Sequence, residues 1–137
     1  MSEDAYSEGM RVRREVLGDE YVDRALAQAT PLSEPFQELI TRYAWGGVWT
    51  RPELDRRTRS AITLALLATL GRDQELGLHV RAALRNGLTP TEIGEVLLQT
   101  AVYAGVPAAN AAFAIVQRVL DEDDVTHRTR PAPAEEG

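Results

Sequence analysis

The stretch DRRTRSAITLALLATLG, residues 55–71, indicates a helical protein more clearly than any other part of the chain. Its first turns are rich in arginine and the rest is apolar, and Gly71 follows as a residue that commonly ends helices. Threonines interrupt the apolar run over 61–70, which is about half the length needed to span a bilayer. We therefore expect a buried helix here and no membrane segment.

Helical signals continue in both directions from this stretch. The strongest is TPTE at 89–92, a capping box with proline at the first helical position. Apolar spacing and glycine stops predict further helices over 4–17, 19–28, 34–45, 73–86, 90–103 and 107–120, and no β-hairpin signal occurs. We therefore expect an all-α, single-domain helical bundle of about six to seven helices over residues 1–122. The acidic and proline-rich remainder, 123–137, is expected to be a disordered tail.

Two of these helices carry more detailed expectations. Ser33 is placed to cap the helix that follows it, with Pro35 in the first turn. Helical spacing in that segment gives an apolar stripe of Phe36, Leu39, Ile40 and Tyr43, and a second face of Glu38, Arg42 and Trp45. The alanines of 108–114 fit against apolar residues such as 96–98, either within one chain or between subunits. The sequence leaves both packings open.

Composition excludes several classes of function. The formal net charge is −6, which disfavours binding to nucleic acid or to an anionic membrane surface. Without cysteine there is no thiol chemistry or disulfide, and with only two histidines we expect no metal site. The chain opens with the acidic residues MSED instead of a charged and apolar leader, so we expect a cytoplasmic protein.

All 15 basic residues are arginine. The codon bias of a GC-rich genome would explain this composition, and so would a need for planar guanidinium groups that hold carboxylates at two points. RYAWGGVWTR, residues 42–51, places both tryptophans of the chain between Arg42 and Arg51. Such a cluster fits either a pocket for a small carboxylate ligand or the packing of a core or subunit interface.

ELGLHVRAALRNG, residues 75–87, contains the only histidine that lies outside the predicted tail. Glu75 and His79 are four residues apart and therefore share one helical face. This spacing fits a surface ion pair, and it equally fits an imidazole near its neutral pKa that a carboxylate orients for proton transfer. The other histidine, His127, falls in the predicted tail, where no role is expected for it.

The spacing of His79, Ala83 and Gly87 resembles the carboxymuconolactone decarboxylase family, which is related to the alkylhydroperoxidase D-like proteins. In the peroxidase branch this pattern follows two cysteines, whose positions hold Arg72 and Glu75 here. The resemblance therefore points to the decarboxylase branch. Segments 6–25, 36–60 and 95–113 are also similar to that branch, so the resemblance covers most of the chain.

This resemblance implies the decarboxylation of 4-carboxymuconolactone to β-ketoadipate enol-lactone and CO2, a step of protocatechuate catabolism. No cofactor or metal is expected, because the lactone carbonyl can accept the electron pair that the departing carboxylate leaves behind. The resemblance also implies a homo-oligomer, with a hexamer expected. Two alternatives are a non-catalytic helical oligomer that binds small organic acids and a cysteine-free relative of the peroxidases with another activity.

The chemistry of this reaction assigns roles to particular residues as hypotheses. His79 is the expected general acid and Glu75 orients it. Guanidinium groups of Arg42, Arg51 and Arg59 are expected to hold carboxylates and the developing negative charge, with Arg59 pointing inward. Trp45 and Trp49 would form an apolar wall. Further polar contacts are expected from Glu38, which lies on the face of Arg42, and from Tyr103 and Asn110.

Overall fold

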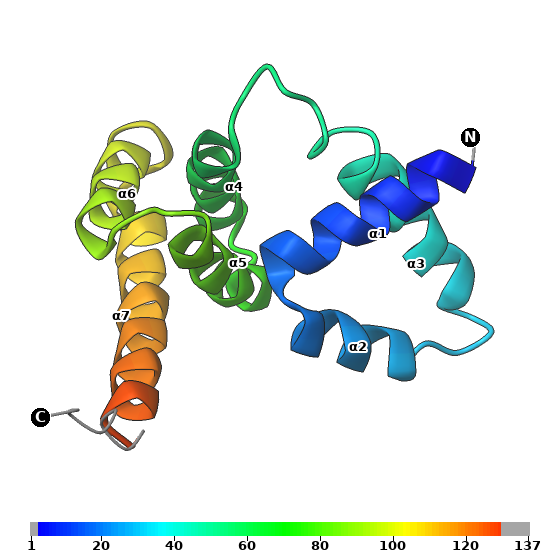
Figure 1. The fold of residues 1–137 in the computed structure, drawn as a ribbon. Coiled ribbons are helices and arrows are strands. Elements are labelled where there is room, and N and C mark those ends of the chain that lie inside the picture. The colour runs from blue at the N-terminus through cyan, green and yellow to red at the C-terminus, as the bar shows by residue number, and fades with distance from the viewer. Residues whose placement is uncertain (1–2, 130–137) are drawn as a thin grey trace, which may run out of the picture.

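The computed structural model describes residues 3–129, and all regular secondary structure in this range is helical (Figure 1). The elements are α1 (Glu3–Leu17), α2 (Asp19–Ala27), α3 (Glu34–Ile40), the π-helix η1 (Thr41–Trp45), α4 (Arg56–Leu70), α5 (Asp73–Arg85), α6 (Pro90–Ala104) and α7 (Val106–Thr129). The expected all-α fold is therefore confirmed. Within the described range, no helix is both long and apolar enough to cross a membrane.

The helices form two groups that meet where α1 contacts α5 (Figure 1). One hydrophobic cluster fills the space among α4, α5, α6 and α7, with Leu64, Leu76, Ile93 and Leu97 at its centre. A second cluster joins α1 and α2 to η1 and includes Ala82 of α5. Since α5 contributes residues to both clusters, it is the element that connects the two groups.

Local signals placed most helix ends correctly. Asp55 caps α4 by accepting a hydrogen bond from the Thr58 amide at 2.7 Å, and Gly71 ends that helix with φ 70°. Both hydrogen bonds of the predicted capping box are present at α6, from the Thr89 amide to Glu92 and from the Glu92 amide to Thr89. These ends depend on contacts within four residues, which makes them readable from sequence.

The segment after residue 30 departs from expectation. Ser33 makes no side-chain cap, because its hydroxyl oxygen instead accepts from the Thr30 amide at 2.9 Å. The α-helix ends at Ile40 and continues as a π-helix, in which the Gly46 amide donates to the Thr41 carbonyl at 2.9 Å. Most of the predicted apolar stripe faces solvent: Phe36, Leu39 and Tyr43 are 58%, 52% and 67% exposed.

A close crossing of α1 over η1 explains the position of this π-helix. A Cβ atom on Gly9 would lie 2.1 Å from the Thr41 carbonyl oxygen, and one on Gly46 would lie 2.3 Å from the Ala5 carbonyl oxygen. The two backbones therefore touch, and only glycine fits at either position. This contact presses Trp45 into the cluster formed with α1 and α5.

The C-terminal helices answer one open question. Leu97, Ala109 and Ala112 are buried within the chain, so at least this part of the α6–α7 contact is an intrachain core. The last helix runs to Thr129, beyond the predicted end at Leu120, and overlaps the first part of the predicted tail. Residues 130–137 of that tail lie outside the described range.

Candidate active site

Three aromatic rings from two distant segments meet beside α5. The indole rings of Trp45 and Trp49 lie 5.1 Å apart between centroids, with an interplanar angle of 30°. The centroid of the His79 imidazole lies 6.4 Å from the centroid of each indole, and the imidazole is nearly parallel to the Trp45 indole, with an interplanar angle of 7°. The structure thus brings together the predicted general acid and both residues of the predicted apolar wall.

The backbone after η1 places the second indole. The Trp49 amide donates to the Ala44 carbonyl at 3.0 Å, and the Thr50 hydroxyl donates to the Gly46 carbonyl at 2.7 Å. These bonds continue the wide turn of the π-helix, which returns Trp49 to the side of Trp45. A π-helical turn often occurs at a functional site because it changes the direction of the side chains that follow.

Burial determines the charge state of His79. Its Nδ1 atom is buried and has no hydrogen-bond partner. Desolvation lowers the pKa of the imidazole to about 4, and the nearby negative charge of Glu75 only partly opposes this shift. The imidazole is therefore neutral at neutral pH, whereas the sequence suggested a pKa near neutrality. It can act as an acid only after a bound anion has raised its pKa.

Glu75 does not orient the imidazole by a direct contact. The residue is exposed on α5, and across residues 3–129 no hydrogen bond joins its carboxylate to His79. Its influence is electrostatic, because its negative charge raises the His79 pKa. The predicted dyad is thus present as a charge interaction on one helical face.

Arg59 lies beside the loop that carries Trp49. Its Nη2 donates to the main-chain carbonyl of Arg51 at 3.2 Å, and Arg51 follows Trp49 by two residues. The Nε atom of Arg59 is buried without a hydrogen-bond partner. Burying a hydrogen-bond donor without an acceptor costs free energy, and a ligand carboxylate could remove this cost by accepting a hydrogen bond from the guanidinium.

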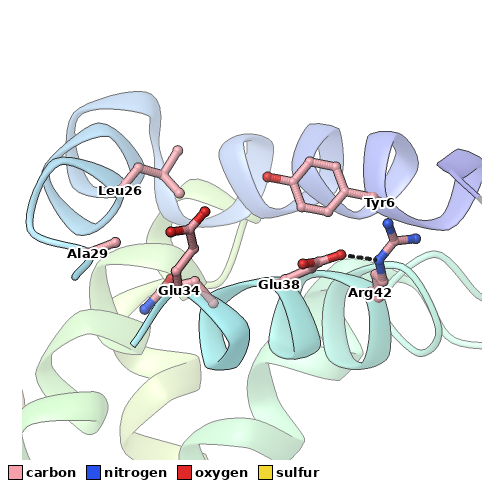
Figure 2. Close-up of a pocket in the computed structure, with 7 residues that line it drawn as sticks. Tyr6, Leu26, Ala29, Glu34, Glu38 and Arg42 are labelled. Carbon is pink, nitrogen blue, oxygen red and sulfur yellow. Dashed lines mark hydrogen bonds and ion pairs between the residues drawn. The ribbon is translucent and has the colours of Figure 1, made fainter. Parts of the chain in front are cut away.

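Arg42 and Glu38 line a different cavity, which Figure 2 shows in close-up. The Arg42 Nε lies 3.2 Å from Glu38 Oε1, and the guanidinium lies over the ring of Tyr6 at 5.4 Å from its centroid. This cavity has a volume of about 450 Å³ and includes Gln37 and Glu34. Neither the imidazole nor an indole belongs to its lining, so the structure separates this pair from the aromatic cluster.

The remaining predicted residues are exposed. Arg51 pairs with Glu53 at 3.9 Å. Tyr103 is 85% exposed and lines an apolar groove between α4 and α6, and Asn110 is exposed on α7. In a single chain, the structure does not group Tyr103 or Asn110 with His79.

One buried charge was not predicted. Arg13 of α1 is only 2% exposed and donates from Nη2 to Gln37 Oε1 at 2.9 Å and from Nη1 to the Thr41 hydroxyl at 3.3 Å. Its Nε has no partner, and desolvation lowers the pKa of the guanidinium. Arg13 therefore ties α1 to the start of the π-helix. Nothing in the sequence distinguishes it from the arginines on either side.

An all-helical chain without cysteine that places one imidazole against two indoles is suited to proton transfer in apolar surroundings, not to thiol chemistry. The family model of the carboxymuconolactone decarboxylase family matches residues 34–118, which include all three rings. The chain belongs to this family.

Two relatives match most of the chain. A 4-carboxymuconolactone decarboxylase of Acinetobacter baylyi is 45% identical over 120 residues, which cover 88% of this chain and 90% of the relative. A nitrosuccinic acid decarboxylase of Metarhizium robertsii is 49% identical over 117 residues, which cover 85% and 82%. A further 4-carboxymuconolactone decarboxylase, of Pseudomonas putida, is 54% identical over 41 residues, or 30% of this chain and 85% of the relative. The chain is thus similar to decarboxylases named for two different acids.

Proposed function

We propose that this protein is a carboxy-lyase that needs no cofactor and removes CO2 from a succinate carrying an electron-withdrawing group. The first candidate substrate is 4-carboxymuconolactone, which would place the protein in protocatechuate catabolism. The second is nitrosuccinate, because the chain is 49% identical to a nitrosuccinic acid decarboxylase. The similarity of this chain to decarboxylases of both acids supports the broader substrate class.

The two acids share the part of the molecule that reacts. In each, the departing carboxylate and a CH2–COO⁻ group are bonded to the same carbon, which also carries an electron acceptor. When the bond to the carboxylate breaks, its electron pair enters the lactone carbonyl through the C=C bond, or enters the nitro group. CO2 leaves, and a proton then adds to the carbon alpha to the lactone carbonyl or to the carbon that carries the nitro group. The substrate itself therefore supplies the electron sink.

The arrangement around His79 is the observation that carries this proposal. The neutral imidazole is partly buried beside the two indoles and has a buried Nδ1 without a hydrogen-bond partner. A bound dianion raises the imidazole pKa by its negative charge, so that His79 takes up a proton and can then deliver it to the carbanion. Trp45 and Trp49 keep water from the departing carboxylate, whose charge disperses as the bond breaks.

Arg59 is the residue we assign to the carboxylate that stays on the substrate. Its unpaired Nε and its position beside the Trp49 loop support this role. The exposed Arg51 stands at the same loop, where it adds positive charge. Arg42, Glu38, Tyr103 and Asn110 have weaker support, because no interaction or cavity described for residues 3–129 joins any of them to the imidazole.

A direct assay tests the proposal and compares the two substrates. The purified protein is mixed with 4-carboxymuconolactone generated in situ, or with nitrosuccinate, without added cofactor or metal. We expect CO2 release with at least one of them, and the ratio of kcat/KM values identifies the preferred acceptor. His79→Gln should fold normally and lose most turnover. Binding of both acids without CO2 release would instead favour a non-catalytic acid-binding protein, and near-normal kcat/KM in His79→Gln would remove the role of the imidazole.

A further inference from the structure

A second cavity, of about 560 Å³, lies between the turn that joins α1 to α2 and the exposed side of α5. Three arginines line it, Arg24 from α2 and Arg81 and Arg85 from α5, together with a single carboxylate, that of Glu20. Its volume falls in the range of small-molecule sites. An excess of positive charge is unusual here, because the chain as a whole has a net charge of −6.

Apart from Glu20, the acidic residues of α2 are already paired. Asp19 and Asp23 of α2 both pair with Arg14, at 3.1 and 2.8 Å. Arg81 pairs with Glu122 at 2.5 Å. Within the part of the chain that the structure describes, Arg24 and Arg85 form no ion pair with any carboxylate. Two guanidinium groups on facing elements therefore remain available to an anion.

The turn fixes the position of Arg85. Its Nη1 donates to the Val16 carbonyl at 3.0 Å, so one edge of the guanidinium is anchored to the backbone. Gly18, at φ 89°, leaves room for this contact, since a Cβ atom there would lie 3.0 Å from Nη2. An anchored guanidinium loses little conformational freedom when it binds an oxyanion at its free edge.

Gln74 and Tyr21 also line the cavity, and Leu17 and Leu78 supply apolar surface. Leu78 also packs against the cluster that contains Trp45, but His79 is not part of the cavity. The cavity is therefore separate from the proposed reaction site, although both depend on α5.

We propose that this cavity binds a small multivalent oxyanion, whose carboxylate or phosphate groups bridge Arg24 and Arg85. Planar guanidinium groups match both kinds of oxyanion by paired hydrogen bonds, and two of them on facing elements favour a ligand with at least two anionic groups. This site does not depend on the reaction proposed for His79.

Binding of citrate and of inorganic pyrophosphate to the full chain tests the site, by calorimetry and by the rise in Tm at constant ionic strength. We expect saturable binding of at least one, and the comparison of the two separates carboxylate from phosphate ligands. Arg24→Gln should raise the Kd about tenfold or more, because a charge-assisted contact is lost while no internal ion pair is broken.

Two control variants make the result specific. Arg72→Gln removes an exposed arginine next to α5 that does not line the cavity, and it should leave the Kd unchanged. His79→Gln should also bind normally, which separates this site from the reaction site. No saturable binding of either anion would overturn the proposal, and so would an equal loss of affinity in Arg24→Gln and Arg72→Gln.

Discussion

At the scale of single residues, the burial of His79 links the stability of the fold to pH. The imidazole pKa is about 4 in the folded chain, below its ordinary value of 6.5, because burial disfavours the charged form. The unfolded chain therefore binds a proton between these values while the folded chain does not, so stability is lost as pH falls from 6.5 towards 4. The expected loss is about 2 kcal/mol by pH 5, measured by urea unfolding.

Carboxylates also titrate in acid, so the comparison with a variant isolates the histidine. His79→Gln should lose less stability than the natural chain between pH 7 and pH 5, by an amount close to that same figure. Parallel stability curves for the two proteins would show that the imidazole is not desolvated as the structure indicates.

The same substitution at Arg59 and at Arg42 tests which of these two arginines binds the substrate, because their surroundings differ. Arg59 has a buried, unpaired Nε beside the Trp49 loop, whereas Arg42 lines another cavity and pairs with Glu38. Arg59→Lys should lower kcat/KM about tenfold, because an ammonium group cannot make the paired contact of a guanidinium. Arg42→Lys should stay close to the natural value. The reverse order would move the anion site to the cavity of Tyr6 and Glu38.

The sequence was enough to place His79 and the two tryptophans in one hypothetical site, but it could not show which of the candidate arginines lie near them. Arg42 and Trp45, three residues apart, share a face only in a regular α-helix. The π-helix has a wider turn, and Arg42 consequently faces Tyr6 while Trp45 enters the core. The low pKa of His79 and the burial of Arg13 were likewise unpredictable, because both arise from packing between segments distant in sequence.

At the scale of secondary-structure elements, the crossing of α1 and η1 controls the aromatic cluster. Gly9→Ala would place a Cβ atom 2.1 Å from a backbone oxygen, which forces the two elements apart. We expect a loss of about 3 kcal/mol in unfolding free energy, near the upper end for an overpacked core. The circular-dichroism signal from coupling of the stacked Trp45 and Trp49 indoles should weaken in parallel.

Gly94→Ala, in α6, is the control for the Gly9→Ala substitution. Gly94 lies inside α6 with no atom near its missing Cβ, so alanine should stabilise the helix by about 0.5–1 kcal/mol and leave the indole signal unchanged. If Gly9→Ala were as harmless as Gly94→Ala, α1 and η1 would not touch through their backbones.

The helix ends could be predicted from the sequence, whereas the π-helix could not. The caps at Asp55 and Thr89 are local hydrogen bonds, so residue type and spacing are enough to predict them. The start of the π-helix at Thr41 depends on Arg13, 28 residues earlier, and on the glycine contact with α1. Only the packed structure contains that information.

At the scale of the whole molecule, apolar surface and charge are distributed unevenly. Residues 96–117 contain no charged residue, nor do residues 60–71 of α4 and its cap. α4 and α6 pack against each other, and large apolar side chains on both helices are exposed to solvent; together we call them the apolar face: Ile62, Leu66, Leu70, Leu98, Val102 and Tyr103. A groove of about 340 Å³ runs between α4 and α6 within this face.

We propose that this apolar face joins copies of the chain, and that it forms one of the interfaces of a homo-oligomer, with a hexamer as the expected size. Copies with a net charge of −6 repel one another, so contact through the face that lacks charge has the lowest electrostatic cost. Apolar patches of this kind typically mark interfaces between proteins. The same contact would bring Tyr103 of one copy against a neighbouring copy.

Light scattering coupled to size-exclusion chromatography tests this proposal. The natural chain should elute at a multiple of its 15.1 kDa mass. Val102→Glu should reduce the size of the assembly, because it buries a carboxylate without a partner in the apolar contact. Ala27→Glu adds the same charge at an exposed position of α2 and should leave the assembly intact. A natural chain that elutes as a monomer, or an assembly that survives Val102→Glu, would show that this face does not join the subunits.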